Sequence, residues 1–235
     1  TDTEVEEFAA YAQSKNFDAG AVSDKDIQKR SKKVLKLAVD GLDIALFGRM
    51  VAQAPELNVQ AAASFSHAIS THAVNNEIEF FTALDDLDTA AGHLDNLEFS
   101  SATYYRYVSL DLGQLYESLQ GEQIQESVQA FTKALFLAIP AARQATMSGA
   151  CGWDYAKVLV RTGQRVQLSF DKPVRANDGF LKPSIEALKS DLEKKEKLFG
   201  SLFGKKMEFE FGGNDNEGID ELLEALSQTI GEING

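Results

Sequence analysis

Short stretches in which apolar and polar residues alternate follow one another between Gly41 and Tyr107. Residues 62–74 alternate in part and residues 103–112 alternate well, so both predict strands whose successive side chains point to opposite faces. The apolar run 42–47 predicts a short buried strand, and residues 78–87 fit a strand or a helix equally. This part of the chain is therefore expected to build sheets from short strands.

Helical signals dominate the remaining sequence. Amphipathic periodicity and boundary residues predict helices at 3–14, 24–39, 123–144, 183–198 and 218–230. Lys157–Arg161 and Arg165–Phe170 flank Thr162-Gly163-Gln164, which predicts a β-hairpin, and Met207–Phe211 alternates as a strand. Short strands and helices mixed in this order indicate an α+β fold rather than a doubly wound parallel sheet.

Cysteine content and hydropathy favour the cytoplasm. Cys151 is the only cysteine, so an internal disulfide framework is excluded and a reducing compartment fits. The first residues are acidic and lack the cationic and apolar parts of a secretory signal. No apolar run approaches the roughly 18 residues of a membrane span.

The net charge of −13 is unfavourable for binding nucleic acid, but it is unevenly distributed. Residues 71–130 carry one basic and 11 acidic side chains, whereas residues 131–206 carry 14 basic and seven acidic ones. Salt screens charges beyond about 8–10 Å, so attraction to phosphate depends on local charge. Any RNA site should therefore use a minority of the surface.

Few residues suggest catalysis or metal binding. His67 and His72 are five apart on a predicted strand, which would place them on opposite faces and prevent them from sharing one metal. We interpret the histidines as hydrogen-bonded residues of a sheet surface or of the base of an extended hairpin. Asp85 and Asp86 could serve a metal-dependent nuclease, although such charge runs are usually solvated. We expect no catalytic residue, metal or cofactor.

A lysine stripe lies on the predicted helix 24–39. Lys25, Lys29, Lys32 and Lys36 follow the spacing i, i+4, i+7, i+11, which places four ammonium groups on one face. Such a row can follow a phosphate backbone without reading bases. A solubilising surface is the other interpretation of the same pattern.

Aromatic residues offer a second way to bind single-stranded RNA, because bases stack on them. The candidates are Phe80, Phe81, Phe99, Tyr104, Tyr105 and Tyr107. We expect Tyr104 and Tyr107 to pack in a core, and Phe81, which precedes Thr82 in a polar-flanked segment, to be exposed.

Four segments occur in a fixed order: DIALFGRM, SHAISTH, FFTALDDL and EFSSATYYRY. With them, residues 41–115 closely resemble the backbone (CasC-type) subunit of the type I-E CRISPR Cascade complex. IPAARQ and NDGFLKPSIEAL extend the resemblance more weakly over residues 123–206.

The resemblance implies an RNA-binding protein that resembles a right hand. A modified RNA-recognition-motif (ferredoxin-like) palm would carry helical fingers and an extended thumb hairpin. Copies would stack head to tail on guide RNA (crRNA) with other Cascade subunits, and unpaired guide bases would face target DNA. The implied segments are fingers 1–40, palm 41–73, thumb 74–101, the remaining palm 102–211 and an acidic C-terminal helix 212–235.

The resemblance also implies site residues. Arg49, Met50, Phe81 and Thr82 would contact RNA, and Lys25, Lys29, Lys32 and Lys36 would contact target-DNA phosphates. The first palm strand and the SSQ-type motif of the family do not precede Thr1, so we expect this chain to lack the N-terminal third. An RNA-recognition-fold protein of another RNA-processing assembly is the runner-up. Arg161 and Arg165 could contact RNA or a neighbouring subunit.

Overall fold

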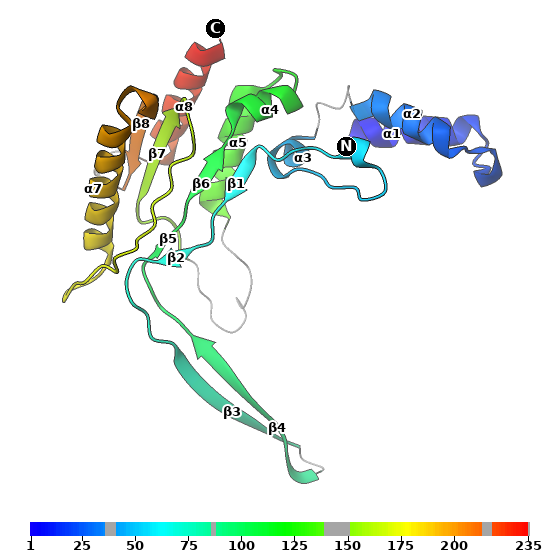
Figure 1. Cartoon of the computed structure of the whole chain (residues 1–235). Helices are drawn as coiled ribbons and strands as arrows, with labels where there is room; N and C mark the ends of the chain where they lie inside the picture. The colour runs from blue at the N-terminus through cyan, green and yellow to red at the C-terminus, as the bar shows by residue number, and fades with distance from the viewer. Residues whose placement is uncertain (36–40, 86–87, 139–150, 213–217, 235) are drawn as a thin grey trace. The chain divides into compact units, whose positions relative to one another are not determined.

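The computed structural model describes residues 1–35, 41–85, 88–138, 151–212 and 218–234 (Figure 1). These residues form two compact units, each assembled from segments that are far apart in the sequence. Unit 1 combines Thr1–Ser64, Val108–Thr162 and Gly204–Gly235, and unit 2 combines Phe65–Tyr107 and Gly163–Phe203. Helices are mixed with small antiparallel sheets, as the α+β prediction required.

Unit 1 contains most of the helices. It begins with α1 (Asp2–Ser14), the short turn η1 (Ala19–Ala21) and α2 (Asp24–Leu35). Its other elements are α3 (Leu42–Phe47), η2 (Pro55–Leu57), β1 (Ala63–Phe65, whose last residue belongs to unit 2), β6 (Val108–Leu110), α4 (Leu112–Ser118), α5 (Ile124–Leu137), β7 (Ala156–Arg161), β8 (Lys205–Phe211) and α8 (Ile219–Asn234).

Helices α1 and α2 pack around one aromatic side chain. Tyr11 of α1 is only 6% exposed, and the Arg30 guanidinium of α2 lies 4.3 Å from its ring centroid. Arg30 also donates to Glu7 of α1 at 2.9 Å. A cation over an aromatic face contributes about 0.5–2 kcal/mol, so Tyr11 and Arg30 join the two helices.

The core of unit 1 brings α4, α5 and α8 together. Leu115 and Leu222 are fully buried, and Ile230 is 2% exposed. Val128 and Phe131 of α5 belong to this core. Ser227 accepts a hydrogen bond from Gln129 at 2.6 Å and so ties α8 to α5. The helices predicted in these regions are confirmed, except that residues 139–144 lie outside the described residues.

Residues 42–47 form helix α3, so the predicted buried strand is wrong. Leu42, Ala45 and Leu46 follow the spacing i, i+3, i+4, and all three pack into the core of unit 1. Phe47 is 61% exposed on the other side of the helix. A six-residue apolar run cannot show by periodicity alone whether it is a strand or a helix.

The predicted hairpin across Thr162-Gly163-Gln164 is also wrong in its second arm. Strand β7 pairs with the distant β8, from Ala156↔Phe211 to Arg161↔Lys205. Residues 165–170 form no strand, and Leu168 is instead buried in unit 2 with its N–H donated to the Tyr105 hydroxyl at 3.2 Å. The alternating strand 207–211 was a better partner for β7 than the adjacent segment.

Unit 2 consists of short strands, a long hairpin and one helix. Strands β2 (Ile69–Ser70) and β5 (Tyr104–Tyr105) pair antiparallel, and η3 (Gly200–Phe203) follows helix α7 (Leu181–Phe199). The predicted strands 62–74 and 103–112 are thus each broken into two pieces, and His67 and His72 lie outside these strands.

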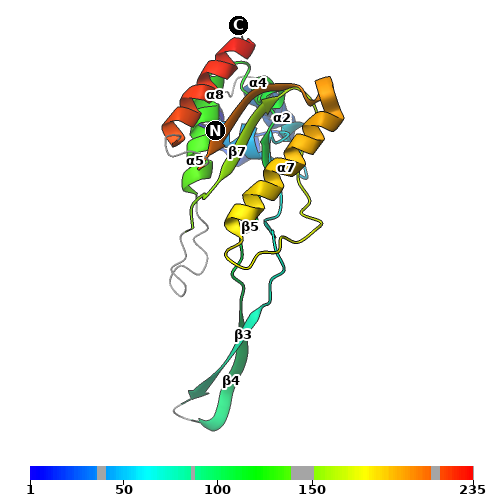
Figure 2. The same ribbon diagram turned by 90° about the vertical axis from the view of Figure 1, so that its left-hand side faces the viewer.

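The ambiguous residues 78–87 belong to the hairpin. Strands β3 (Glu77–Asp85) and β4 (Asp88–Phe99) pair antiparallel from Glu77↔Phe99 to Asp85↔Asp88, and residues 86–87 between them lie outside the described residues. Figures 1 and 2 show the two strands side by side along their whole length. The hairpin falls within the segment implied to be the thumb.

No helix among the described residues is long and apolar enough to cross a membrane.

We expect Leu115→Ala to lower the free energy of unfolding by about 2–5 kcal/mol, because the variant leaves a cavity in the core of unit 1. Leu137→Ala makes the same chemical change in the same unit at a side chain that is 72% exposed, and should cost less than about 0.5 kcal/mol. Urea denaturation of both variants measures the difference. Equal losses would contradict the assignment of the core.

The β7–β8 sheet should show a defined pH dependence. Lys157 forms ion pairs with Glu208 and with Glu210 across the sheet. Hydrogen bonds from Lys157 and Lys205 lower the pKa of Glu208 below its ordinary value of 4.5. This contribution to stability is therefore complete above about pH 4.5 and is lost as the pH falls through the folded-state pKa.

We expect Lys157→Met to lower the free energy of unfolding at about pH 7, and the difference from the unsubstituted chain to shrink towards about pH 3 as the carboxylates become protonated. Lys206→Met is the matched control, because Lys206 is an exposed lysine of β8, the strand that pairs with β7. Its difference from the unsubstituted chain should not vary over this range. Denaturation at several pH values tests both, and a constant deficit for Lys157→Met would contradict the electrostatic explanation.

Candidate nucleic-acid interface

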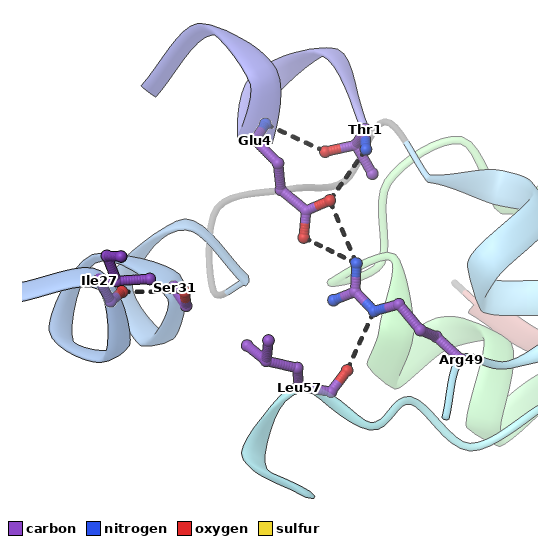
Figure 3. A network of polar contacts seen from close by, with 6 residues as sticks. All are labelled: Thr1, Glu4, Ile27, Ser31, Arg49 and Leu57. Carbon is purple, nitrogen blue, oxygen red and sulfur yellow. Dashed lines mark hydrogen bonds and ion pairs between the residues drawn. The ribbon is translucent and has the colours of Figure 1, made fainter. Parts of the chain in front are cut away.

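Arg49 holds the start of the loop that follows α3. Its guanidinium donates to both carboxylate oxygens of Glu4 at 2.9 and 3.1 Å, and its Nε donates to the Leu57 carbonyl at 3.0 Å (Figure 3). Its backbone pairs with Val59 as an isolated antiparallel bridge. The loop is therefore closed at its base and tied to α1.

The electrostatics of this network favour the ion pair. Partial burial raises the pKa of Glu4, but hydrogen bonds from the Thr1 ammonium and from Arg49 outweigh it, so that the net pKa is lowered. Gly48 precedes Arg49 with φ of 77°, and a side chain there would meet the Val59 carbonyl oxygen at 2.8 Å. A glycine is thus required where the loop leaves α3.

Met50 is the exposed member of the pair predicted to contact RNA. Its side chain is 85% exposed, whereas that of Arg49 is 23% exposed and already has a carboxylate partner. A phosphate would have to compete with Glu4 for the Arg49 guanidinium. The arrangement makes Arg49 a positioning residue for the loop and leaves the flexible thioether of Met50 available for contact.

Two of the four lysines predicted to contact DNA are exposed on α2. Lys25 and Lys29 lie one turn apart on the same face of the helix. Lys32 belongs to the next turn of α2, and Lys36 lies outside the described residues. The described part of the stripe is consistent with either a phosphate contact or a solubilising surface.

Phe81 and Thr82, both predicted to contact RNA, lie on opposite faces of the β3–β4 hairpin. They are adjacent in β3, so their side chains point to opposite faces. Phe81 is 39% exposed, as predicted, but Phe80 is 71% exposed and lies on the face of Thr82 together with Ile78, which is 52% exposed. The sequence indicated the aromatic pair, but only the strand register identifies Phe80 as its more accessible member.

The same hairpin is strongly acidic. Residues 74–101 contain no lysine or arginine and seven carboxylates, at Glu77, Glu79, Asp85, Asp86, Asp88, Asp95 and Glu98. Such a charge repels phosphate, so contacts between the hairpin and RNA would have to be made by apolar and aromatic side chains with bases.

Exposed aromatics occur elsewhere in unit 2. Tyr104 is 52% exposed, so the expectation that it packs in a core is wrong. The Arg106 guanidinium, the only cation in residues 65–107, lies 5.6 Å from the ring centroid of Phe65. Alternation along a strand identifies its two faces but cannot show which of them is covered.

His72 is hydrogen-bonded, as expected, but it is buried and lies outside the strands rather than on a sheet surface. Its Nδ1 lies 2.9 Å from the Ala73 carbonyl oxygen, and its Nε2 accepts from the Thr103 N–H at 3.2 Å. Both contacts are satisfied by the neutral ring with the proton on Nδ1. His67 is exposed.

No group of three or more metal-ligating side chains occurs within the described residues. Asp86, one of the two carboxylates of the nuclease alternative, lies outside them. The nuclease alternative therefore stays untested.

Solved structures with this fold include chains of two CRISPR surveillance complexes. A chain of a "CRISPR RNA-guided surveillance complex, pre-nicking" matches with a TM-score of 0.68 and 23% identity over 80% of this chain and 55% of the other. A chain of a "CRISPR RNA-guided surveillance complex" matches with a TM-score of 0.67 and 22% identity over 88% of this chain and 84% of the other. This chain thus spans about half the length of the first.

No curated protein matches this chain in sequence. The model of the family Cas_CT1975, described as "CT1975-like protein", matches residues 1–231 of 235. The chain therefore belongs to the CT1975-like protein family.

Proposed function

We propose that this chain is a non-catalytic backbone subunit of a CRISPR Cascade surveillance complex. One observation carries the proposal: 88% of this chain superimposes on 84% of a chain from a CRISPR RNA-guided surveillance complex, at a TM-score of 0.67. Membership of the Cas_CT1975 family and the four segments typical of the type I-E backbone subunit support it further.

In this proposal the subunit contacts the sugar-phosphate backbone of guide RNA (crRNA), and it does so in the cytoplasm. The strands of the palm would form a modified RNA-recognition-motif sheet, α1 and α2 would belong to the fingers, and the β3–β4 hairpin would be the thumb. Apolar contacts suit the thumb because its seven carboxylates exclude phosphate. Met50, Phe81 and Thr82 would contact bases at the points where the RNA bends.

Assembly is the second part of the proposal. A head-to-tail contact joins different surfaces of identical copies and does not close, so it extends into a helical filament. Other Cascade subunits would be further partners. Lys25 and Lys29, with Lys32 and Lys36, would contact the phosphates of target DNA while guide bases pair with it.

We expect binding to fluorescent single-stranded RNA to strengthen with RNA length and to weaken steeply with salt, by a log–log slope of about 0.7 for each phosphate contact. Titrations with RNAs of increasing length, each at several salt concentrations, measure both effects, and light scattering counts the copies bound. A complex that stays one-to-one as the RNA lengthens would contradict filament assembly. RNA cleavage that requires Mg²⁺ and Asp85 would favour the nuclease instead.

Hairpin contacts should depend on aromatic stacking rather than charge. We expect Phe80→Ala and Phe81→Ala each to weaken RNA binding by about 1–3 kcal/mol and to leave the salt slope unchanged, because stacking involves no counterion release. Phe17→Ala removes an aromatic that is 75% exposed outside the hairpin, and should leave binding unchanged. Equal losses in all three variants would argue against a role for the hairpin.

A further inference from the structure

Unit 2 contains a cleft of about 380 Å³ that the proposed function has not used. Its lining includes His72, Val174, Arg175, Asn177 and Phe180. This volume lies within the range of about 300–1,000 Å³ that is usual for ligand sites. The lining residues come from two segments that are more than 90 positions apart in the sequence, so the cleft is a product of tertiary folding.

The walls of the cleft are fixed by contacts that need no ligand. The His72 ring stacks on Phe180 with centroids 3.8 Å apart and an interplanar angle of 15°. Next to them, the Val174 N–H donates to the Thr71 carbonyl at 2.8 Å, and the buried Ser184 hydroxyl donates to that of Thr71 at 2.7 Å. A site held in this way loses little conformational entropy when it binds.

The polar groups at the cleft are available for binding. Arg175 and Asn177 are both exposed, and neither has a hydrogen bond, ion pair or ring contact within the described part of the chain. This contrasts with Arg30 and Arg49, whose guanidinium groups are paired with Glu7 and Glu4. Residues 163–203, which contribute Arg175, carry eight basic and six acidic side chains, in contrast to the acidic hairpin of the same unit.

We propose that this cleft binds one nucleotide of single-stranded RNA, with Arg175 on the phosphate. A guanidinium is planar and binds a phosphate through two parallel hydrogen bonds. The Asn177 amide can donate to and accept from a base or ribose edge, and the ring of Phe180 offers an apolar wall. The inference rests on the proposed function, since it adds a phosphate contact to a unit whose hairpin has no cation.

The test uses the full chain and a fluorescent RNA of about eight nucleotides, within the range covered by a single domain. We expect Arg175→Ala to bind roughly tenfold more weakly at low salt and to reduce the log–log salt slope by about 0.7, because one phosphate contact is lost. Asn177→Ala should weaken binding with an unchanged slope. Lys172→Ala removes a neighbouring exposed cation that does not line the cleft, and should change neither quantity.

The outcomes separate this proposal from the function on which it rests. If the unsubstituted chain binds no RNA, the proposed function fails and the cleft proposal fails with it. If RNA binds and Arg175→Ala matches Lys172→Ala, the cleft proposal alone is overturned. If Arg175→Ala keeps its affinity for the short RNA but no longer assembles on longer RNA, Arg175 contacts a neighbouring subunit and the RNA site is likewise overturned. Because Arg175 has no partner in the described part of the chain, its loss should leave the unfolding transition unchanged.

Discussion

The shared burial of Leu115, Leu222 and Ile230 holds unit 1 together, because these residues come from segments that are distant in the sequence. Helix α8 packs against α5, and β8 pairs with β7, so the last residues of unit 1 complete a core that earlier residues begin. Contacts between distant segments form at a cost in loop-closure entropy. In the sequence, residues 65–107 and 163–203, which build unit 2, alternate with the segments of unit 1.

Local signals in the sequence predicted the long helices. Helices α1, α5, α7 and α8 were identified by periodicity and boundary residues, because their faces repeat over several turns. Helix α3 was missed because six residues are too few to establish a period. The segment after Arg161 was wrongly predicted to pair with β7, because the strand that does pair with β7 is β8, over 40 residues away. Non-local pairing is the information that a local pattern lacks.

The candidate site was less predictable, because exposure and pairing depend on tertiary contacts. The sequence named Arg49 and Met50 together, yet Arg49 is occupied by Glu4, which is 45 positions away, while Met50 is 85% exposed. The sequence singled out Phe81, yet Phe80, on the opposite face of β3, is the more exposed of the two. Arg175 carried no local signal at all, since its availability follows from the absence of a partner among the described residues.

The stability of the β3–β4 hairpin is linked to its proposed contacts with RNA. An isolated two-stranded hairpin is only marginally stable in water, and β3–β4 has no third strand among the described residues. Its carboxylates repel one another, and its exposed Ile78 and Phe80 contribute no core. Covering these apolar side chains with a partner would therefore add free energy that stabilises the hairpin. In a guide-RNA filament, apolar contacts with bases would provide it, so that binding and ordering of the hairpin would be a single thermodynamic event.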